Sequence, residues 1–182
     1  MEPPPAPSIA VDAAPAGNVD AVIGEIRALN AGAPIVRAAS PVRLEDPAAV
    51  RGRRVLVVED GPTLTHGGMA YGAGWVAATR AGAAAIVDPR TSASPGVRAI
   101  FARYPHIGDV LPAVGYDADQ LRQLRETINR AAADVVVAAT PLDLAALIAL
   151  EKPVVRARYE YADAGEPTLG SLVDAFLSGR KG

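Results

Sequence analysis

Acidic side chains of this sequence come directly after a strongly apolar run. Glu59 and Asp60 end the segment RRVLVVED, and Asp88 with Arg90 follows the next apolar run along the chain. Adjacent carboxylates beside a hydrophobic strand suit Mg²⁺, because that ion prefers hard oxygen ligands. We therefore predict that Glu59 and Asp60 are catalytic and bind the metal. The alternative is that they are solvated loop carboxylates.

The loop GPTLTHGGMAYGAG at 61–74 combines glycines with hydroxyl, imidazole and phenol groups. Glycine lets backbone amides approach an anion closely, and a helix that begins near Gly74 adds a positive dipole end. The loop is therefore predicted to cradle a phosphate or carboxylate, with His66 as a catalytic residue; the alternative is a flexible surface loop. The predicted substrate-binding residues of this loop are Thr63, Thr65, Gly67, Gly68, Met69, Tyr71, Gly72 and Gly74.

The two histidines of the sequence, His66 and His106, both lie in predicted loops. Imidazole can donate to phosphate or carry protons near neutral pH, although a loop histidine is more often a bystander. His106 belongs to the segment YPHIG, which we expect to close over the same site as the glycine-rich loop. We therefore include His106 among the predicted substrate-binding residues.

Two arginines, Arg156 and Arg158, alternate along the predicted strand 154–159 and so share one of its faces. Their guanidinium groups are forked donors that suit a phosphate or carboxylate. Together with Asp88 and Arg90 they complete the predicted substrate-binding set. The alternative for the two strand arginines is a salt bridge to Glu160 or to a neighbouring helix.

Apolar runs typical of strands alternate with helical periodicity along the chain. We expect strands at 34–38, 53–59, 84–87, 134–139 and 154–159, and helices at 19–30, 74–81, 96–103, 118–131, 142–150 and 169–178. Such alternation favours parallel pairing, since parallel neighbours need a crossover helix. The predicted fold is a doubly wound α/β sheet, mostly parallel, with helices on both faces. Ligands bind such folds beyond the carboxyl ends of the strands.

Length and composition fit one domain that binds a small molecule. The 182 residues are 50% hydrophobic and carry a net charge of −2 with mixed signs, which disfavours nucleic acid and anionic membranes as partners. Cysteine is absent, so thiolate metal sites and disulfides are excluded. We expect a disordered proline-rich tail at 1–10, a single α/β domain at 11–182, no membrane span and a cytoplasmic location.

Several longer motifs resemble one known family. VLVVEDGPTLTHGGMAYGAGWVAA, IVDPR, FARYPHIGDVLPAVGY, LRETINRAAADVVVAATPLDL and KPVVRARYE are similar to the C-terminal region of cyclic 2,3-diphosphoglycerate synthetases and related predicted GTPases. The resemblance runs from about Val11 to the end. It implies a P-loop NTPase-like half, in which ATP drives closure of 2,3-diphosphoglycerate into a cyclic phosphoanhydride with Mg²⁺ as companion.

The sequence departs from that family where the nucleotide should bind. It contains no G-x-x-x-x-G-K-[ST] loop, and Ile9 and Ala10 stand where the family's N-K-x-D motif has asparagine and lysine, so only Asp12 matches. The resemblance therefore implies the substrate-binding part of a ligase that uses ATP or GTP, with the nucleotide site outside this chain. Its expected partners are a phosphorylated small molecule and either a P-loop-bearing chain or a second copy.

Two other functions remain open at this stage. The chain is alternatively a non-catalytic module that binds anions or phosphometabolites or supports assembly, or a fragment without an independent role. Polyphosphorylated acids should stabilise the anion-binding module thermally without turnover. The fragment should instead purify as an aggregated or molten chain.

Overall fold

The computed structural model describes residues 16–114 and 117–179 and contains two compact units. The larger unit spans residues 43–158, and the smaller one is formed by the segments before and after it. The predicted tail at 1–10 and the N-K-x-D positions lie outside the described residues. A single domain over 11–182 therefore stays a prediction.

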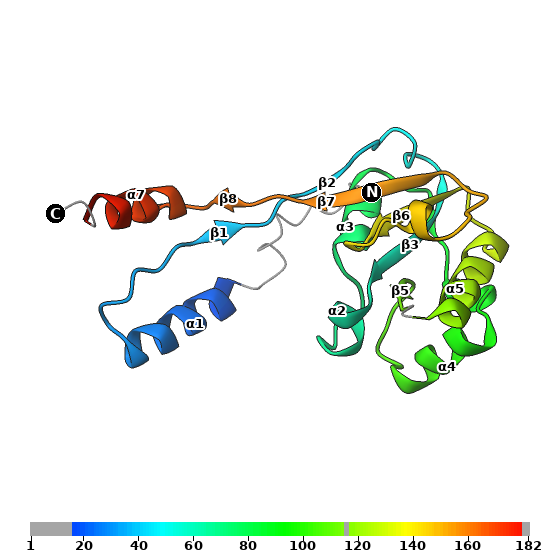
Figure 1. The fold of residues 1–182 in the computed structure, drawn as a ribbon, viewed down its shortest axis with the longest axis horizontal. Helices are drawn as coiled ribbons and strands as arrows, with labels where there is room; N and C mark the ends of the chain where they lie inside the picture. The colour runs from blue at the N-terminus through cyan, green and yellow to red at the C-terminus, as the bar shows by residue number, and fades with distance from the viewer. Residues whose placement is uncertain (1–15, 115–116, 180–182) are drawn as a thin grey trace, which may run out of the picture. The chain divides into compact units, whose positions relative to one another are not determined.

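A mostly parallel sheet forms the centre of the larger unit (Figure 1). Its strand order is β2 (Val42–Leu44), β7 (Val154–Tyr159), β6 (Val135–Ala139), β3 (Arg54–Asp60) and β4 (Ala85–Ile86). β3 runs parallel to β6 and β4, and its second half also pairs in parallel with β5 (Leu111–Ala113). With helices flanking this sheet, the predicted doubly wound α/β fold is confirmed.

The central strand is buried because its sequence is aliphatic on both faces. Residues Val55 to Val58 of β3 have no exposed side-chain area, and the neighbouring strand β6 is buried along its whole length. Burying one such side chain is worth about 1.5–3 kcal/mol relative to leaving it exposed. An uninterrupted apolar run thus forms the core of the sheet, as its sequence predicts.

Helices of the larger unit fall close to their predicted positions. They are α3 (Ala73–Arg80), α4 (Pro95–Arg103), α5 (Ala118–Arg130) and α6 (Leu144–Leu147), with a short 3-10 helix at Pro89–Thr91. α3 packs on β3 and β6, while α4 packs on α5. The predicted helix at 142–150 is shortened to four residues, because Asp143 caps it and the backbone becomes extended at Ile148.

The glycine-rich segment is a loop only in part, which corrects the sequence analysis. Its first five residues form the helix α2 (Gly61–Thr65), with Asp60 as N-cap and Pro62 in the first turn. A capping aspartate followed by proline in the first turn is a helix start signal, and the glycines that follow obscured it. The strands β2 and β5 and the two-residue strand β8 (Ala162–Asp163) were also missed, since each is very short.

The smaller unit contains two helices and a two-stranded antiparallel ladder. The ladder joins β1 (Ala38–Ala39) to β8, so the predicted strand at 34–38 reaches the observed one at a single residue. The helices are α1 (Ala16–Leu29) and α7 (Leu169–Gly179), both close to their predicted bounds. No helix among the described residues is both long and apolar enough to cross a membrane.

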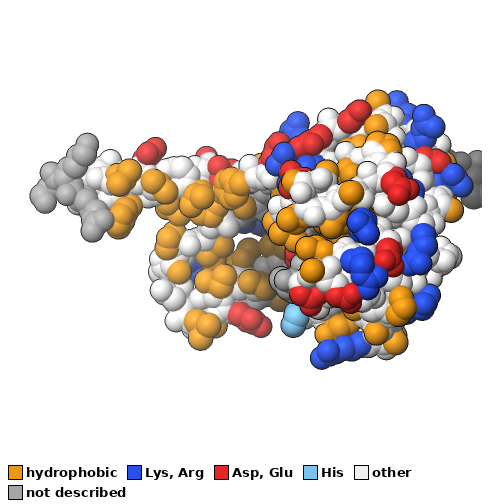
Figure 2. Space-filling view, turned by 45° about the vertical axis from the view of Figure 1, so that its right-hand side comes forward, with side chains coloured by type: hydrophobic (Ala, Val, Ile, Leu, Met, Phe, Trp, Pro, Cys, Tyr) orange, Lys and Arg blue, Asp and Glu red, His pale blue; other side chains and the backbone are white. Residues whose placement is uncertain are grey.

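Apolar side chains of the smaller unit lie on its surface rather than in a core. Helical spacing places Val22, Ile26 and Leu29 on one face of α1, and all three side chains are exposed. α7 likewise exposes Val173 and Phe176. Figure 2 shows hydrophobic side chains gathered on this surface. The periodicity therefore predicted the two helices, and these apolar side chains are exposed among the described residues.

Candidate functional site

The carboxylate of Glu59 lies at the N-terminus of α3. It is 1% exposed, and its Oε1 accepts hydrogen bonds from the backbone N–H of Gly72 at 3.1 Å and of Trp75 at 2.8 Å. The N-cap residue Gly72 has no side chain to bind these amides. Burial raises the pKa of Glu59, and the backbone hydrogen bonds oppose that rise. Glu59 therefore caps α3 from the neighbouring strand.

Two glycines allow this close approach. A Cβ atom at Gly72 would lie 2.6 Å from Oε2 of Glu59, and one at Gly74 would lie 2.7 Å from the Cβ of Ala139. These residues must be glycine so that the helix can reach the carboxylate and pack on the sheet. The backbone amides at the start of α3 therefore bind the Glu59 carboxylate. Substrate binding by Gly72 and Gly74 stays a prediction.

Asp60 caps a different helix from Glu59. Its Oδ2 accepts hydrogen bonds from the backbone N–H of Thr63 at 3.3 Å and from the Thr63 hydroxyl at 2.9 Å, which holds the start of α2. Among residues 16–114 and 117–179, no three acidic or histidine side chains are grouped as a metal site requires. Glu59 and Asp60 thus each cap a helix, and metal binding by the pair stays a prediction through which we derive no step.

The glycine-rich segment and the YPHIG turn are joined by hydrogen bonds. The backbone N–H of Gly108 donates to the carbonyl of Ala70 at 2.7 Å, and Nε2 of His106 lies 2.8 Å from the carbonyl oxygen of Leu64. A carbonyl oxygen only accepts, so this imidazole carries its proton on Nε2. The two segments are therefore held together by backbone and side-chain hydrogen bonds, and substrate binding by His106 stays a prediction.

Arg90 fixes the far side of the same turn. Its guanidinium donates to the carbonyl of Gly108 at 3.0 Å and to that of Ile107, pairs with Asp88 at 3.1 Å, and stacks on the ring of Phe101 at 4.3 Å. Forked geometry of this kind suits arginine rather than lysine. Its contacts hold the turn in place, and substrate binding by Asp88 and Arg90 stays a prediction.

The arginines of β7 form ion pairs. Nη1 of Arg156 lies 3.3 Å from Oδ2 of Asp143, the N-cap residue of α6, and Nε of Arg158 donates to Oε1 of Glu45 at 2.7 Å. Ion pairs with Asp143 and Glu45 thus fit the salt-bridge alternative for both side chains. Their role in substrate binding stays a prediction.

A cavity of about 540 Å³ opens beyond the carboxyl ends of β3 and β5. Gly61 follows β3 and Val114 follows β5, so the cavity lies where open α/β sheets bind ligands. Two predicted residues, Thr65 and His66, line it. The remaining lining comprises Gly61, Pro62, Gly96, Val97, Ile100, Tyr104, Val114, Asp117, Asp119, Gln120 and Gln123. The other predicted site residues lie outside this lining.

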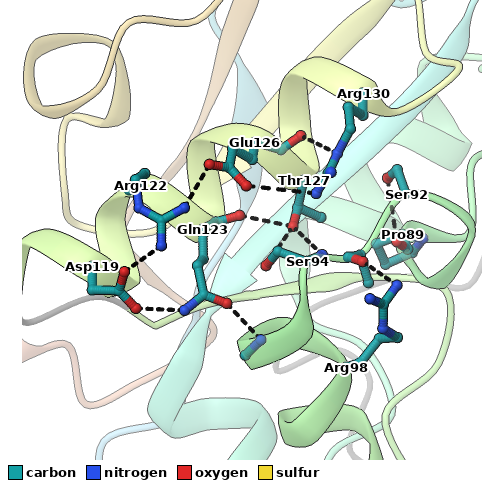
Figure 3. Close-up of polar contacts among 12 residues, drawn as sticks. Pro89, Ser92, Ser94, Arg98, Asp119, Arg122, Gln123, Glu126, Thr127 and Arg130 are labelled. Atoms are coloured by element: carbon teal, nitrogen blue, oxygen red, sulfur yellow. Dashed lines mark hydrogen bonds and ion pairs between the residues drawn. The ribbon is translucent and has the colours of Figure 1, made fainter.

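Polar contacts between α4 and α5 shape one wall of the cavity (Figure 3). Gln123 on α5 accepts from the backbone N–H of Gly96 at 2.5 Å and donates to Asp119 at 2.6 Å. The buried hydroxyl of Thr127 donates to the Gln123 carbonyl at 2.8 Å and accepts from the N–H of Ser94 at 3.0 Å. Buried groups with satisfied partners are held firmly, so this wall is preorganised.

Thr65 and His66 are linked at the opposite wall. The Thr65 hydroxyl lies 2.9 Å from the carbonyl oxygen of Gly61, one turn earlier in α2, and 3.0 Å from Nδ1 of His66. The described residues provide no hydrogen-bond partner for Nε2 of His66, which is an exposed residue at the cavity. One ring nitrogen is thus fixed by the fold while the other remains accessible.

The comparison with known proteins connects this fold to a synthetase. Over 164 residues, the chain is 47% identical to arginine synthetase ArcE from Thermococcus kodakarensis. The match covers 90% of this chain but 37% of the relative, so the chain spans little more than a third of that protein. No protein-family profile matches the chain, and no solved structure matches it.

The relative is named as a synthetase, and the cyclic 2,3-diphosphoglycerate synthetase family expected from the motifs stays a prediction. Residues from α4 and α5 in the cavity wall were missed by sequence reasoning. Their only signal was the helical spacing of α5, whose apolar side faces the core while Asp119, Gln120 and Gln123 lie along another side. A polar helix side usually faces solvent, so no local pattern assigned this side of α5 to a cavity.

Proposed function

We propose that this chain is the substrate-binding part of a nucleotide-dependent synthetase. The observation that carries the proposal is the 47% identity to a protein named as a synthetase, extending over 90% of the chain. The cavity at the strand ends supports it, because that is where α/β enzymes bind their ligands. In this view, residues of the cavity bind and orient the substrate, while the energy source binds elsewhere.

ATP or GTP, together with Mg²⁺, is the energy source in this proposal. The printed sequence contains no P-loop motif, so the nucleotide would bind a P-loop-bearing partner chain or another segment of the assembly. When bound, the nucleotide would supply a phosphoryl group that activates the substrate. The contribution of this chain is to place the substrate against that group and to exclude water from it.

The cavity favours a substrate with nitrogen donors and a short aliphatic body. Asp119 is ionised at neutral pH, since hydrogen bonds from Arg122 and Gln123 hold its pKa below its usual range. Val97 and Ile100 supply an apolar wall, and no lysine or arginine occurs in the lining among the described residues. We therefore propose a substrate or product of arginine type, which is consistent with the name of the relative.

Cyclic 2,3-diphosphoglycerate synthesis is the second candidate function. The motifs DGPTLTHGGM and YPHIG favour it. A substrate with two phosphates calls for several cationic or forked donors, however, and the described lining of the cavity contains His66 but no lysine or arginine. Binding of a phosphorylated acid would therefore depend on residues of a partner chain or on a surface other than this cavity.

Calorimetric titration of the chain with L-arginine and with 2,3-diphosphoglycerate tests the substrate class. We expect saturable binding of arginine, with Ile100→Trp weakening it at least tenfold because the indole fills the cavity. Ala99→Trp, at an exposed position of the same helix, is the matched control and should leave the affinity unchanged. If 2,3-diphosphoglycerate binds and arginine does not, the substrate class is a phosphorylated acid instead. Such binding without turnover would favour the anion-binding module.

Co-expression with a P-loop protein encoded beside the gene tests the reaction class. We expect the two chains to co-purify and to release nucleoside diphosphate in step with the formation of arginine. Nucleotide turnover that responds neither to a substrate of arginine type nor to 2,3-diphosphoglycerate would reject the synthetase proposal. The absence of both a complex and turnover would also reject it.

A further inference from the structure

The hydrogen-bond chain through Thr65 determines which nitrogen of His66 carries a proton. A threonine hydroxyl has one proton to donate and lone pairs that accept. Its proton has a partner in the carbonyl of Gly61, 2.9 Å away and four residues earlier, which is the usual acceptor of a helical threonine. With that proton in use, the hydroxyl can only accept from His66, and Nδ1 must be the protonated nitrogen.

A neutral imidazole has a single N–H, so Nε2 of His66 then carries a lone pair. His66 lines the cavity, and Nε2 has no hydrogen-bond partner among the described residues. His106 shows the opposite arrangement, since its Nε2 carries the proton that it donates to the Leu64 carbonyl. The two histidines of this chain are therefore held in opposite tautomers, His66 by the Thr65 hydroxyl and His106 by the Leu64 carbonyl.

We propose that Nε2 of His66 accepts a proton from an N–H or O–H group of the ligand in the cavity, and that Thr65 is a positioning residue for this base. The inference rests on the proposed function for the identity of the ligand but not for the tautomer. Thr65 then acts through His66, whereas the sequence alone predicted that Thr65 contacts the substrate directly.

The proton transfer is balanced within this arrangement. The bond between the ligand nitrogen or oxygen and its proton breaks, its electron pair stays on the ligand atom, and the proton forms a new bond to Nε2. His66 becomes an imidazolium ion whose Nδ1–H still donates to the Thr65 hydroxyl. The ligand atom becomes a better nucleophile toward an activated acceptor, and a positioned base of this kind contributes about 10²–10⁴-fold to a rate.

Long-range ¹H–¹⁵N spectra of the labelled full chain test the tautomers. They are recorded at about pH 8.5, well above the ordinary imidazole pKa of about 6.5. We expect a protonated Nδ1 for His66 and a protonated Nε2 for His106. Thr65→Val should reduce the Nδ1–H population of His66, and Thr65→Ser, which keeps the hydroxyl, should restore it. An Nε2–H form of His66 in the unmodified chain would overturn the proposal.

Titration with L-arginine, the probe for the cavity, then separates this inference from the proposed function. We expect arginine to shift the Nε2 resonance of His66 while that of His106 stays constant. Arginine that binds without shifting Nε2 of His66 would overturn its role as proton acceptor. If arginine does not bind, the proposed substrate of arginine type is rejected. The spectra still decide the tautomer of His66 and its dependence on Thr65.

Turnover in the complex with the P-loop partner provides the functional readout. His66→Gln should lower kcat by at least a hundredfold with little change in KM, and Thr65→Val should lower kcat by about tenfold. Thr65→Ser, which keeps the hydroxyl, should restore most of the lost kcat. A role of Thr65 that depended only on side-chain volume would not predict this recovery. An unchanged kcat in His66→Gln would reject the base.

Discussion

The carboxylate of Glu59, at the end of the central strand, accepts a 2.8 Å hydrogen bond from the backbone N–H of Trp75 in the first turn of α3. The same oxygen binds the N–H of Gly72. A helix that starts with glycine thus obtains its cap from a strand residue thirteen positions earlier. Glu59 therefore holds the glycine-rich segment in its folded position.

Replacing Glu59 by alanine should destabilise the chain by about 2–4 kcal/mol, because buried N–H groups lose their acceptor and a cavity forms. Glu59→Gln keeps an oxygen acceptor and should have a smaller effect. Urea unfolding followed by circular dichroism measures both. Equal losses in the two variants would show that the charge of the carboxylate, and not a neutral oxygen acceptor, holds α3.

Stability should depend on pH through Glu59 in a defined direction. Burial raises the pKa of Glu59 above its ordinary value of 4.5, so the folded state binds this proton more tightly than the unfolded state. The free energy of unfolding of the native chain, minus that of Glu59→Gln, should therefore be largest below pH 4.5. It should fall as the pH rises from there through the pKa of the folded state. A difference that rises over this range would contradict the direction.

Asp134 should titrate in the strongly acidic range. Side-chain and backbone hydrogen bonds from Arg54 lower the pKa of Asp134 from 3.8 to about 2. Its stabilising effect should be complete above pH 3.8 and disappear as the pH falls through about 2. Carboxyl ¹³C NMR measures the midpoint. Arg54→Ala should move that midpoint back toward 3.8, and an unchanged midpoint would reject the guanidinium as the cause.

Gly74→Ala should destabilise the larger unit by about 1–3 kcal/mol, because overpacking displaces neighbouring atoms. The added Cβ would lie 2.7 Å from the Cβ of Ala139 and 2.9 Å from Cγ1 of Val57. Gly24→Ala in α1 is the matched control, since nothing lies within 4 Å of its added Cβ. It should favour its helix by up to about 1 kcal/mol. Thermal unfolding compares the two, and similar losses would argue against the contact with β6.

Arg90→Lys should loosen the turn that packs against the glycine-rich segment, since lysine cannot reproduce the forked contacts to Ile107 and Gly108. Hydrogen exchange of the Gly108 amide, which donates to Ala70, measures the effect and should accelerate at least tenfold. Arg130→Ala is the control, because its exposed ion pair with Glu126 contributes little. Unchanged protection in Arg90→Lys would show that the turn is held by its backbone alone.

Local signals in the sequence determined most of the elements of this fold. The aliphatic run before Asp60 predicted the central buried strand, and the periodicity of residues 118–131 predicted α5 within one residue. Alternation of the two patterns predicted the parallel α/β sheet. These features depend on residues that are close in sequence, so propensity and burial act on them without knowledge of distant partners.

The partners of the polar side chains were decided only by the tertiary structure. The sheet and α3 bring the Glu59 carboxylate to backbone amides that lie far from it in sequence order. Strand pairing likewise places Arg158 beside Glu45. The cavity joins α2 to α4 and α5 across some sixty residues, from Gly61 to Gln123. Such contacts depend on strand order and helix packing, which a single sequence does not encode in any local pattern.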